Sequence, residues 1–323
     1  MNDEKKSKNY FQFLTGIVVG VLILAVIGIY SSDKIKTPNL TLKSLEGNDE
    51  PVFKIVTPRI PGSLKFAGES VPLQNFEVKE RIEREFLVNA YWYSATILGM
   101  KRANRWFPVI EPILKKFNVP DDFKYIPVIE SNLYNSTSPA GAVGFWQFTK
   151  DVAIKYGLEV DDQVDERYNV EKSTVAACKY LLDADSIFKS WTLAAASFNM
   201  GKNGLAKQIE RQGEHNYYNL LLSDETSRYI ARLIAVKEIF THPHDYNFYL
   251  SKEELYQPLK TYNVVVNTSI DDWTDFAKSH GINYKILKYY NPWLRDISLT
   301  NKKRFSYEIK LPVKGSIEII GDN

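Results

Sequence analysis

A glutamate at the end of an apolar run is the residue in this sequence that is best suited to chemistry. Glu130 lies in the segment Tyr125–Asn132, which we expect to be the end of a helix that begins near Asp121. Burial raises the pKa of a carboxyl group, and the negative end of a helix raises it further. A carboxylic acid that stays protonated near neutral pH can protonate the leaving oxygen of a glycoside. Glu130 is therefore the candidate general acid, and the alternative is a surface glutamate that merely follows a helix.

Two further segments contain side chains suited to binding a sugar. The segment Ser138–Phe148 starts with small residues that permit a tight turn. It ends with aromatic rings that could stack on a sugar and with Gln147, whose amide could hydrogen-bond to an N-acetyl group or hydroxyls. The segment Leu193–Gly201 places Asn199 at a helix end, where its amide can project into a cleft. Taken alone, Asn199 would be an ordinary residue at a helix C-terminus.

Together these segments resemble the lytic transglycosylase domain related to goose-type lysozyme, and in particular the membrane-bound lytic murein transglycosylase D group. That family has a catalytic Glu followed by Ser, a small-residue turn into Gly-x-x-Gln, an Ala-x-x-Asn-x-Gly element, and Glu-Thr followed by Tyr. Between about residues 80 and 240 this sequence has the four elements in that order: Glu130-Ser131, Gly144 to Gln147, Ala196 to Gly201, and Glu225 to Tyr229. Phe198 and Met200 replace the more usual Tyr and Ala, which affects the expected substrate contacts and not the class.

The resemblance implies roles for individual residues. Glu130 would be the acid and base, and the substrate-binding residues would be Ser131, Gly144, Phe145, Trp146, Gln147, Phe198, Asn199 and Tyr229. The implied reaction cleaves the β-1,4 bond between N-acetylmuramic acid and N-acetylglucosamine in peptidoglycan and leaves a 1,6-anhydromuramyl end. Ordinary glycosidases use two carboxylates, whereas this family uses one and needs no metal or cofactor.

Two alternative functions depend on other features. The acidic stretch Asp161–Glu166 could supply a second carboxylate for a muramidase that hydrolyses the same bond, although most such runs are solvated loops. A non-catalytic anchor that binds peptidoglycan is the third possibility. His242 and His244 lack a third metal ligand nearby, so we expect no metal site. Cys178 is the only cysteine, so it forms no intramolecular disulfide and is expected to be a packing residue.

The sequence predicts a mainly α fold. Apolar residues at helical spacing on charged segments indicate a catalytic domain over residues 76–245, all helical and, by the resemblance, lysozyme-like. We expect helices over 80–93, from Trp106 to Leu114, from an Asp121 N-cap, and around 149–156, 171–186, 191–199 and 224–240. A connector over 246–259 follows.

The segment 260–315 is expected to be a small, separate β-α-α-β module. Its strands are Thr261–Val266 and Tyr307–Pro312, and its helices begin with a Ser269 N-cap and at Tyr284. It resembles a LysM domain, which binds glycans that contain N-acetylglucosamine. The segment Asn267–Ser269 replaces the usual Gly-Asp-Thr turn, so glycan binding and a purely structural role both stay open.

The N-terminal part predicts a membrane anchor. Residues 11–31 form an apolar run without charges up to Tyr30, long enough to span the roughly 30 Å bilayer core and longer than the apolar part of a signal peptide. A short cytoplasmic tail over 1–10 and a linker over 32–75 flank it. The catalytic domain would then lie outside the cytoplasmic membrane, in the bacterial cell envelope.

The composition excludes one class of partner. Lys and Arg number 41 and Asp and Glu 39, for a net charge of +2, which gives no electrostatic basis for binding nucleic acid. The expected partners are peptidoglycan glycan strands and, through the N-terminal helix, the membrane. The 20 Tyr, 17 Phe and 6 Trp suit sugar binding and core packing equally. The sequence identifies no protein partner.

Overall fold

The computed structural model describes residues 56–317, which belong to one compact unit. The expected tail over 1–10, the expected membrane helix over 11–31 and the linker up to residue 55 lie outside the described residues. Within residues 56–317, no helix is both long enough and apolar enough to span a bilayer.

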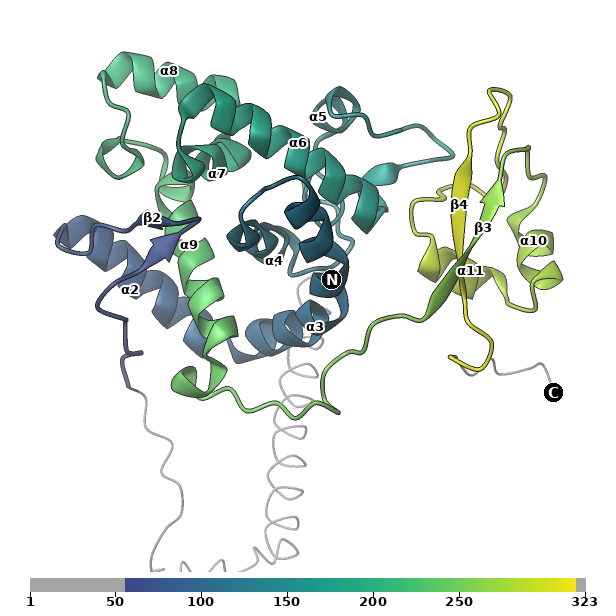
Figure 1. Ribbon diagram of the computed structural model, residues 1–323, viewed down its shortest axis with the longest axis horizontal. Helices are drawn as coiled ribbons and strands as arrows, with labels where there is room; N and C mark the ends of the chain where they lie inside the picture. The colour runs from purple at the N-terminus through teal and green to yellow at the C-terminus, as the bar shows by residue number, and fades with distance from the viewer. Residues whose placement is uncertain (1–55, 318–323) are drawn as a thin grey trace, which may run out of the picture. The chain divides into compact units, whose positions relative to one another are not determined.

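As expected, helices make up most of the structure before the C-terminal module, and we call this the helical part (Figure 1). A short hairpin precedes its helices. The hairpin consists of β1 (Lys65–Phe66) and β2 (Glu69–Ser70). The α-helices are α2 (Phe76–Tyr91), α3 (Tyr93–Lys116), α4 (Ile126–Ser131), α5 (Lys150–Lys155), α6 (Val170–Phe188), α7 (Trp191–Met200), α8 (Lys202–Gln212) and α9 (Asp224–Thr241). Short 3-10 helices are η1 (Asp121–Tyr125), η2 (Glu166–Tyr168), η3 (Tyr217–Asn219) and η4 (Pro243–Tyr246).

Helix α9 holds this part together because it packs against α2, α4 and α7 (Figure 1). Ser223 caps its N-terminus by accepting a hydrogen bond from the Thr226 amide, which satisfies a donor that has no partner within the helix. Helix α2 contributes Ile82 and Phe86, one turn apart and fully buried. This i, i+4 spacing places them on one face, which packs toward the core.

Two local expectations about these helices were wrong. Helix α3 begins at Tyr93 and continues through Pro108 and Pro112, whereas we expected a helix start at Trp106. Its buried apolar face on both sides of the prolines, including Ala103 and Leu114, offsets the hydrogen bonds that proline removes. Asp121 is not an N-cap, because Pro120 occupies that position and no side chain caps the helix.

Helix α8 was not predicted at all. Its sequence is mostly polar, and only Leu205 and Ile209 are buried among its eleven residues. Two apolar residues give a weak periodic signal, so the helix is visible in the structure and not in the pattern.

The residues just before α2 contribute to the core. Leu64, Phe66 and Val71 are buried and pack into the same apolar cluster as α2 and α9. Glu69 accepts hydrogen bonds from the amides of Trp191 and Thr192, at 2.7 and 3.0 Å. The segment that we expected to be a linker up to residue 75 therefore already packs against the helical part from about Ile60 onward.

The C-terminal module has the predicted β-α-α-β order. It comprises β3 (Thr261–Val266), α10 (Trp273–Ser279), α11 (Tyr284–Tyr290) and β4 (Tyr307–Pro312). The strands are antiparallel, and Val264 pairs with Ile309. The N-cap of α10 is Asp272, three residues later than the expected Ser269, because the segment before it pairs with the chain around Leu299.

A loop of the helical part inserts into this module, and we call residues 159–168 the docking loop. Val164 is 1% exposed and belongs to the apolar core of the module. Its backbone forms a bridge with Leu294, and the adjacent Asp165 amide donates to the carbonyl oxygen of Trp293 at 2.9 Å. The module is therefore packed on the helical part by a shared core.

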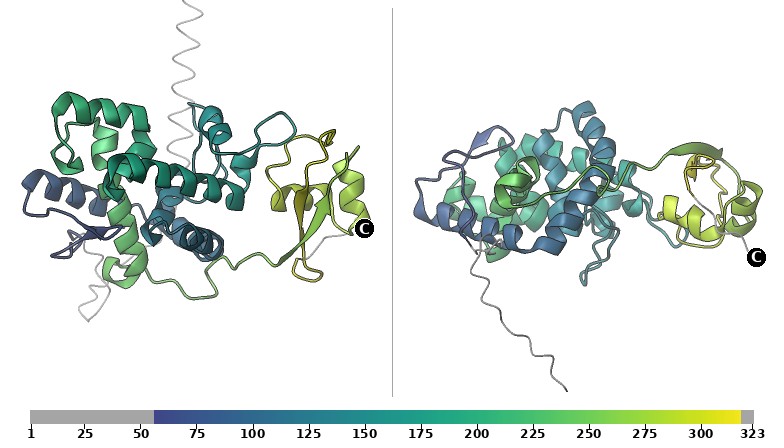
Figure 2. Two further views of the ribbon diagram at one scale, coloured as in Figure 1. Left: turned by 45° about the horizontal axis from the view of Figure 1, so that its top comes forward. Right: turned by 90° about the horizontal axis from the view of Figure 1, so that it is seen from below.

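The connector between η4 and β3 follows α3 on its way to the module (Figure 2). The Tyr256 amide donates to the carbonyl oxygen of Lys101 at 3.2 Å. Asn104 and Arg105 donate to the carbonyl oxygens of Tyr256 and Gln257. These bonds fix the connector on the helix.

Candidate active site

Glu130 lies in the last turn of α4, and its position supports the expected acid. Asn132 caps the C-terminus of this helix and has a left-handed backbone conformation with φ of 51°. Burial is the largest effect on Glu130 and raises the pKa of its carboxyl group. The negative charge of Glu225 raises this pKa further, while the Tyr229 hydrogen bond and the Arg232 charge lower it. Because burial is the largest effect, the carboxyl group of Glu130 keeps its proton to higher pH than an exposed glutamate does.

Helix α9 supplies the groups that contact Glu130 or its helix. The Tyr229 hydroxyl donates to Oε1 of Glu130 at 2.7 Å. Tyr229 is fully buried, and burial raises its own pKa far above the ordinary tyrosine value, so the phenol remains a donor. Arg232 donates to the carbonyl oxygen of Ile129 at 2.9 Å, which ties α9 to the last turn of α4.

Ser131 connects α4 to the small-residue turn. Its hydroxyl lies 2.9 Å from the carbonyl oxygens of both Pro127 and Phe145 and donates to the backbone. The structure thus gives Ser131 a supporting contact, whereas the sequence placed it in the wall of a groove.

The turn at Gly144 depends on glycine. Its φ is +79°, and a Cβ atom there would lie 2.1 Å from the carbonyl oxygen of Arg167. Gln147 also has a positive φ, 49°, and its Nε2 donates to the Gly144 carbonyl oxygen at 2.7 Å. No donor within residues 56–317 reaches its Oε1, so this oxygen is left for a ligand.

Trp146 and Phe145 do not present ring faces to a sugar, which corrects the expectation of stacking. Trp146 is fully buried, and its Nε1 donates to Thr174 at 3.0 Å. Phe145 is 2% exposed and packs edge-on against Trp106. Both rings fill the space under the turn. Phe198 is half-buried and packs against the rings of Trp146, Phe148 and Tyr180.

Asn199 joins the end of α7 to the start of α9. Its Oδ1 accepts a hydrogen bond from the Thr226 hydroxyl at 2.8 Å, and its Nδ2 donates to Glu225 at 3.0 Å. Asn199 therefore holds the carboxylate whose charge helps raise the pKa of Glu130. Glu225 and Arg232 were not among the candidate site residues. The Glu-Thr element pointed to Glu225, and Arg232 could have been found one turn after Tyr229 on the same helix face.

The rival acidic stretch has structural partners. Asp165 forms a buried ion pair with Arg167 at 2.7 Å. Glu166 accepts from the Glu159 amide and pairs with Lys172. These contacts hold the docking loop in shape, so they give no support to a second catalytic carboxylate there.

The two candidate histidines and the cysteine also have structural contacts only. His242 contacts Glu238, and His244 stacks on Tyr249. In residues 56–317 no three potential ligands gather to hold a metal ion. Cys178 is fully buried, and burial raises its pKa to about 12, so it is an inert packing residue as predicted.

Comparisons with known families match both parts of the chain. The model described as the transglycosylase SLT domain matches residues 108–221. The model described as the soluble lytic transglycosylase C-terminal LysM-like domain matches residues 262–315.

Curated proteins are also similar to parts of the chain. Membrane-bound lytic murein transglycosylase D of Escherichia coli strain K12 is 25% identical over 243 residues, which cover 72% of this chain and 52% of that protein. A putative tributyltin chloride resistance protein of Alteromonas sp. strain M-1 is 30% identical over 121 residues, which cover 36% of this chain and 58% of that protein. The chain thus spans about half the length of the transglycosylase D that it matches.

Proposed function

The chain belongs with the SLT-domain lytic transglycosylases and carries their C-terminal LysM-like domain, and from this premise we propose that it cleaves peptidoglycan glycan strands. The bond cut is the β-1,4 link between N-acetylmuramic acid and N-acetylglucosamine, and the product carries a 1,6-anhydromuramyl end. The observation that supports the proposal most directly is the half-buried carboxyl group of Glu130, whose pKa is raised by burial and which accepts a hydrogen bond from Tyr229 at 2.7 Å.

In the first step, protonated Glu130 gives its proton to the oxygen that leaves with N-acetylglucosamine. The acetamido oxygen of the muramic acid stabilises the positive charge that develops at its C1 carbon. A raised pKa suits this step, because the proton must be present near neutral pH.

In the second step, the Glu130 carboxylate takes the proton of the C6 hydroxyl, and O6 attacks C1 to close the anhydro ring. The attacking group belongs to the same sugar, so its effective concentration exceeds that of water. The Tyr229 hydrogen bond stabilises the carboxylate between the two steps. The Oε1 atom of Gln147, which accepts no hydrogen bond within residues 56–317, and the amide of Asn199 are the proposed contacts to the substrate.

The cellular location of the enzyme follows from the same proposal. The substrate surrounds the cytoplasmic membrane, so the described residues would act in the cell envelope, with the apolar run over residues 11–31 as the anchor. The LysM-like module would hold the enzyme on its insoluble substrate, and two linked weak contacts raise the overall affinity.

The test is product analysis after purified peptidoglycan is incubated with the full-length protein. Mass spectrometry should find anhydro-muropeptides. Glu130→Gln should lower their rate of formation by about 10²–10⁴-fold, the usual contribution of a general acid. Glu210→Gln, an exposed change on α8, is the matched control and should keep the wild-type rate.

Other products would identify other functions. Reducing muramic acid ends, heavier by one water, would show a muramidase. Binding to peptidoglycan with no released products would show a non-catalytic wall-binding protein.

A further inference from the structure

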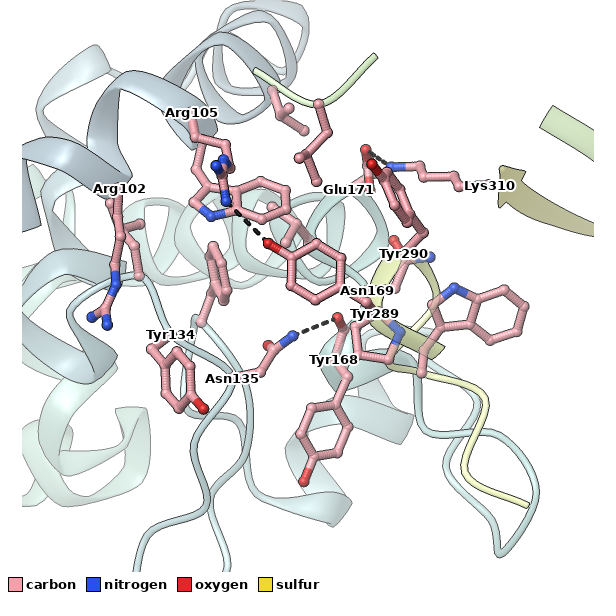
Figure 3. A pocket seen from close by; sticks show the side chains of 18 of the residues that line it. Arg102, Arg105, Tyr134, Asn135, Tyr168, Asn169, Glu171, Tyr289, Tyr290 and Lys310 are labelled. Atoms are coloured by element: carbon pink, nitrogen blue, oxygen red, sulfur yellow. Dashed lines mark hydrogen bonds and ion pairs between the residues drawn. The ribbon is translucent and has the colours of Figure 1, made fainter. Parts of the chain in front are cut away.

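A cavity lies between the helical part and the C-terminal module, separate from Glu130. Its volume is about 500 Å³, which is within the range of small-molecule sites. Its walls come from α3, the segment after Glu130, the start of α6, the connector and the module (Figure 3). Glu130 does not line it.

The cavity is close to the active site along the chain. Tyr134 and Asn135 line it and follow Glu130 by four and five residues. Phe145 also lines it, and the carbonyl oxygen of Phe145 accepts the hydrogen bond of Ser131. A long polymer bound at Glu130 would therefore have a neighbouring portion available for this cavity.

The charge of the cavity favours an anion. Arg102, Arg105 and Lys310 are its cationic side chains, and Glu171 is its acidic one. Lys310 and Glu171 form an ion pair with each other (Figure 3). No carboxylate in the described part of the chain pairs with either arginine, so two positive charges remain.

The two arginines are held in place and still have free donors. Arg105 donates from Nε to the Gln257 carbonyl oxygen and from Nη1 to the Tyr289 hydroxyl, at 3.0 and 3.1 Å. Arg102 donates from Nη1 to the Asn132 carbonyl oxygen at 3.0 Å. A guanidinium has five N–H donors in a planar fork that matches a carboxylate, so each arginine can bind one while keeping these contacts.

The aromatic side chains suit the rest of such a ligand. Tyr134 and Tyr289 line the cavity from opposite parts of the structure, and each is 59% exposed. The Arg102 guanidinium lies over one face of the Tyr134 ring, 5.1 Å from its centroid, and a ring face that stays exposed can stack on the apolar face of a sugar ring. The cavity therefore combines aromatic surface with two arginines that can each bind a carboxylate.

We propose that this cavity binds a carboxylate-bearing sugar-peptide, namely the peptide-substituted portion of the glycan strand next to the bond that is cut. The proposal rests on the proposed function for the identity of the polymer. Arg102 and Arg105 each bind a carboxylate of the peptide, and Tyr134 and Tyr289 contact the sugar. Both the helical part and the module are needed to form this site, because Arg105 comes from α3 and Tyr289 from the module.

The test compares two ligands of one size on the full-length chain with Glu130→Gln, which stops turnover. One ligand is a purified disaccharide-peptide with free carboxylates, and the other is the same compound with its carboxylates converted to amides. Calorimetry should show at least roughly ten-fold tighter binding of the carboxylate form, since charge-assisted bonds to arginine are strong. Arg102→Gln or Arg105→Gln should reduce this ratio toward one, and Arg211→Gln on α8, outside the cavity, should leave it unchanged.

The outcomes separate this proposal from the proposed function. Equal affinity for the two ligands, or a ratio that the Arg102 and Arg105 changes do not alter, would overturn the cavity assignment even if anhydro-muropeptides form. A ratio that falls in both arginine variants while the wild-type chain releases no products would uphold the cavity and reject the transglycosylase.

Discussion

At the scale of residues, the Tyr229 hydroxyl opposes the effect of burial on Glu130. Its hydrogen bond lowers the pKa of the carboxyl group, while burial raises it more. Tyr229→Phe should therefore raise the pKa of Glu130 further. The rate falls at high pH when the acid loses its proton, so the alkaline side of the pH–rate profile should move to higher pH.

Initial rates of anhydro-muropeptide release across pH would measure this shift. Tyr217→Phe is the matched control, because the Tyr217 hydroxyl bonds to the carbonyl oxygens of Thr226 and Ser227 and not to Glu130. A shift to lower pH in Tyr229→Phe, or an equal shift in both variants, would contradict the assigned role.

Gly144 gives a second prediction at this scale. Gly144→Ala places a methyl group 2.1 Å from the Arg167 carbonyl oxygen, whereas Gly141, with a similar φ of +77°, has open space around its Cβ direction. Both changes carry the cost of a positive φ, about 1–2 kcal/mol, and only Gly144→Ala adds a backbone collision. Urea unfolding should show a clearly larger loss for Gly144→Ala, and equal losses would show that the close approach does not matter.

The local sequence predicted the surroundings of Glu130 better than those of the aromatic side chains. Glu130 follows an apolar run, which pointed to the partial burial that raises its pKa, while its role as the acid stays a prediction. Whether Trp146 faces a sugar or the core depends on Thr174 in α6, which accepts its N–H. That contact joins positions 28 residues apart, and no local pattern contains it.

At the scale of elements, α7 is held at its N-terminus by a residue from the hairpin. The carboxylate of Glu69 accepts from the amides of Trp191 and Thr192, at the positive end of the helix. Glu69→Ala should lower the free energy of unfolding by about 1–2 kcal/mol, the range for loss of a helix cap. Chemical denaturation measures this loss of stability. The control is Glu210→Ala, at an exposed position of α8.

A loss below about 0.5 kcal/mol in Glu69→Ala, which is typical of an ordinary surface change, would show that the hairpin does not support α7. The far end of α7 carries Asn199, so activity should fall with stability.

The elements were predictable where an apolar face repeats, as in α2, α6 and α9. The predicted helix from Trp106 to Leu114 contained both prolines of α3 but missed its first part, from Tyr93 to Arg105. The buried residues of that part include Thr96, Gly99 and Ala103, whose small or polar side chains give a weak apolar pattern. The hairpin before α2 lacked a signal for a similar reason, since its strands are two residues long and their burial comes from partners far along the chain.

At the scale of the whole molecule, the docking loop joins the two parts through Val164. Val164→Asp would put a charge without a partner into the module's core, which costs several kcal/mol. We expect the module to unfold at a lower temperature than the helical part, giving two transitions in calorimetry of the full-length chain. Val265→Asp, at a position 62% exposed on β3, should keep the wild-type profile.

Limited proteolysis provides a second measurement, because an unfolded module is cut first. A single unchanged transition in Val164→Asp would show that the shared core does not stabilise the module.

The docking loop has one more consequence, which is mechanical. Its last residues contain Arg167, whose Nη1 donates to the carbonyl oxygens of Gly141 and Phe148, on either side of the turn that carries Gln147. A pull on the module is therefore transmitted through the loop to the backbone of that turn. If the module binds a glycan strand that is under tension, this tension would alter the position of Gln147. Stretched and relaxed strands would then encounter binding sites of different shape.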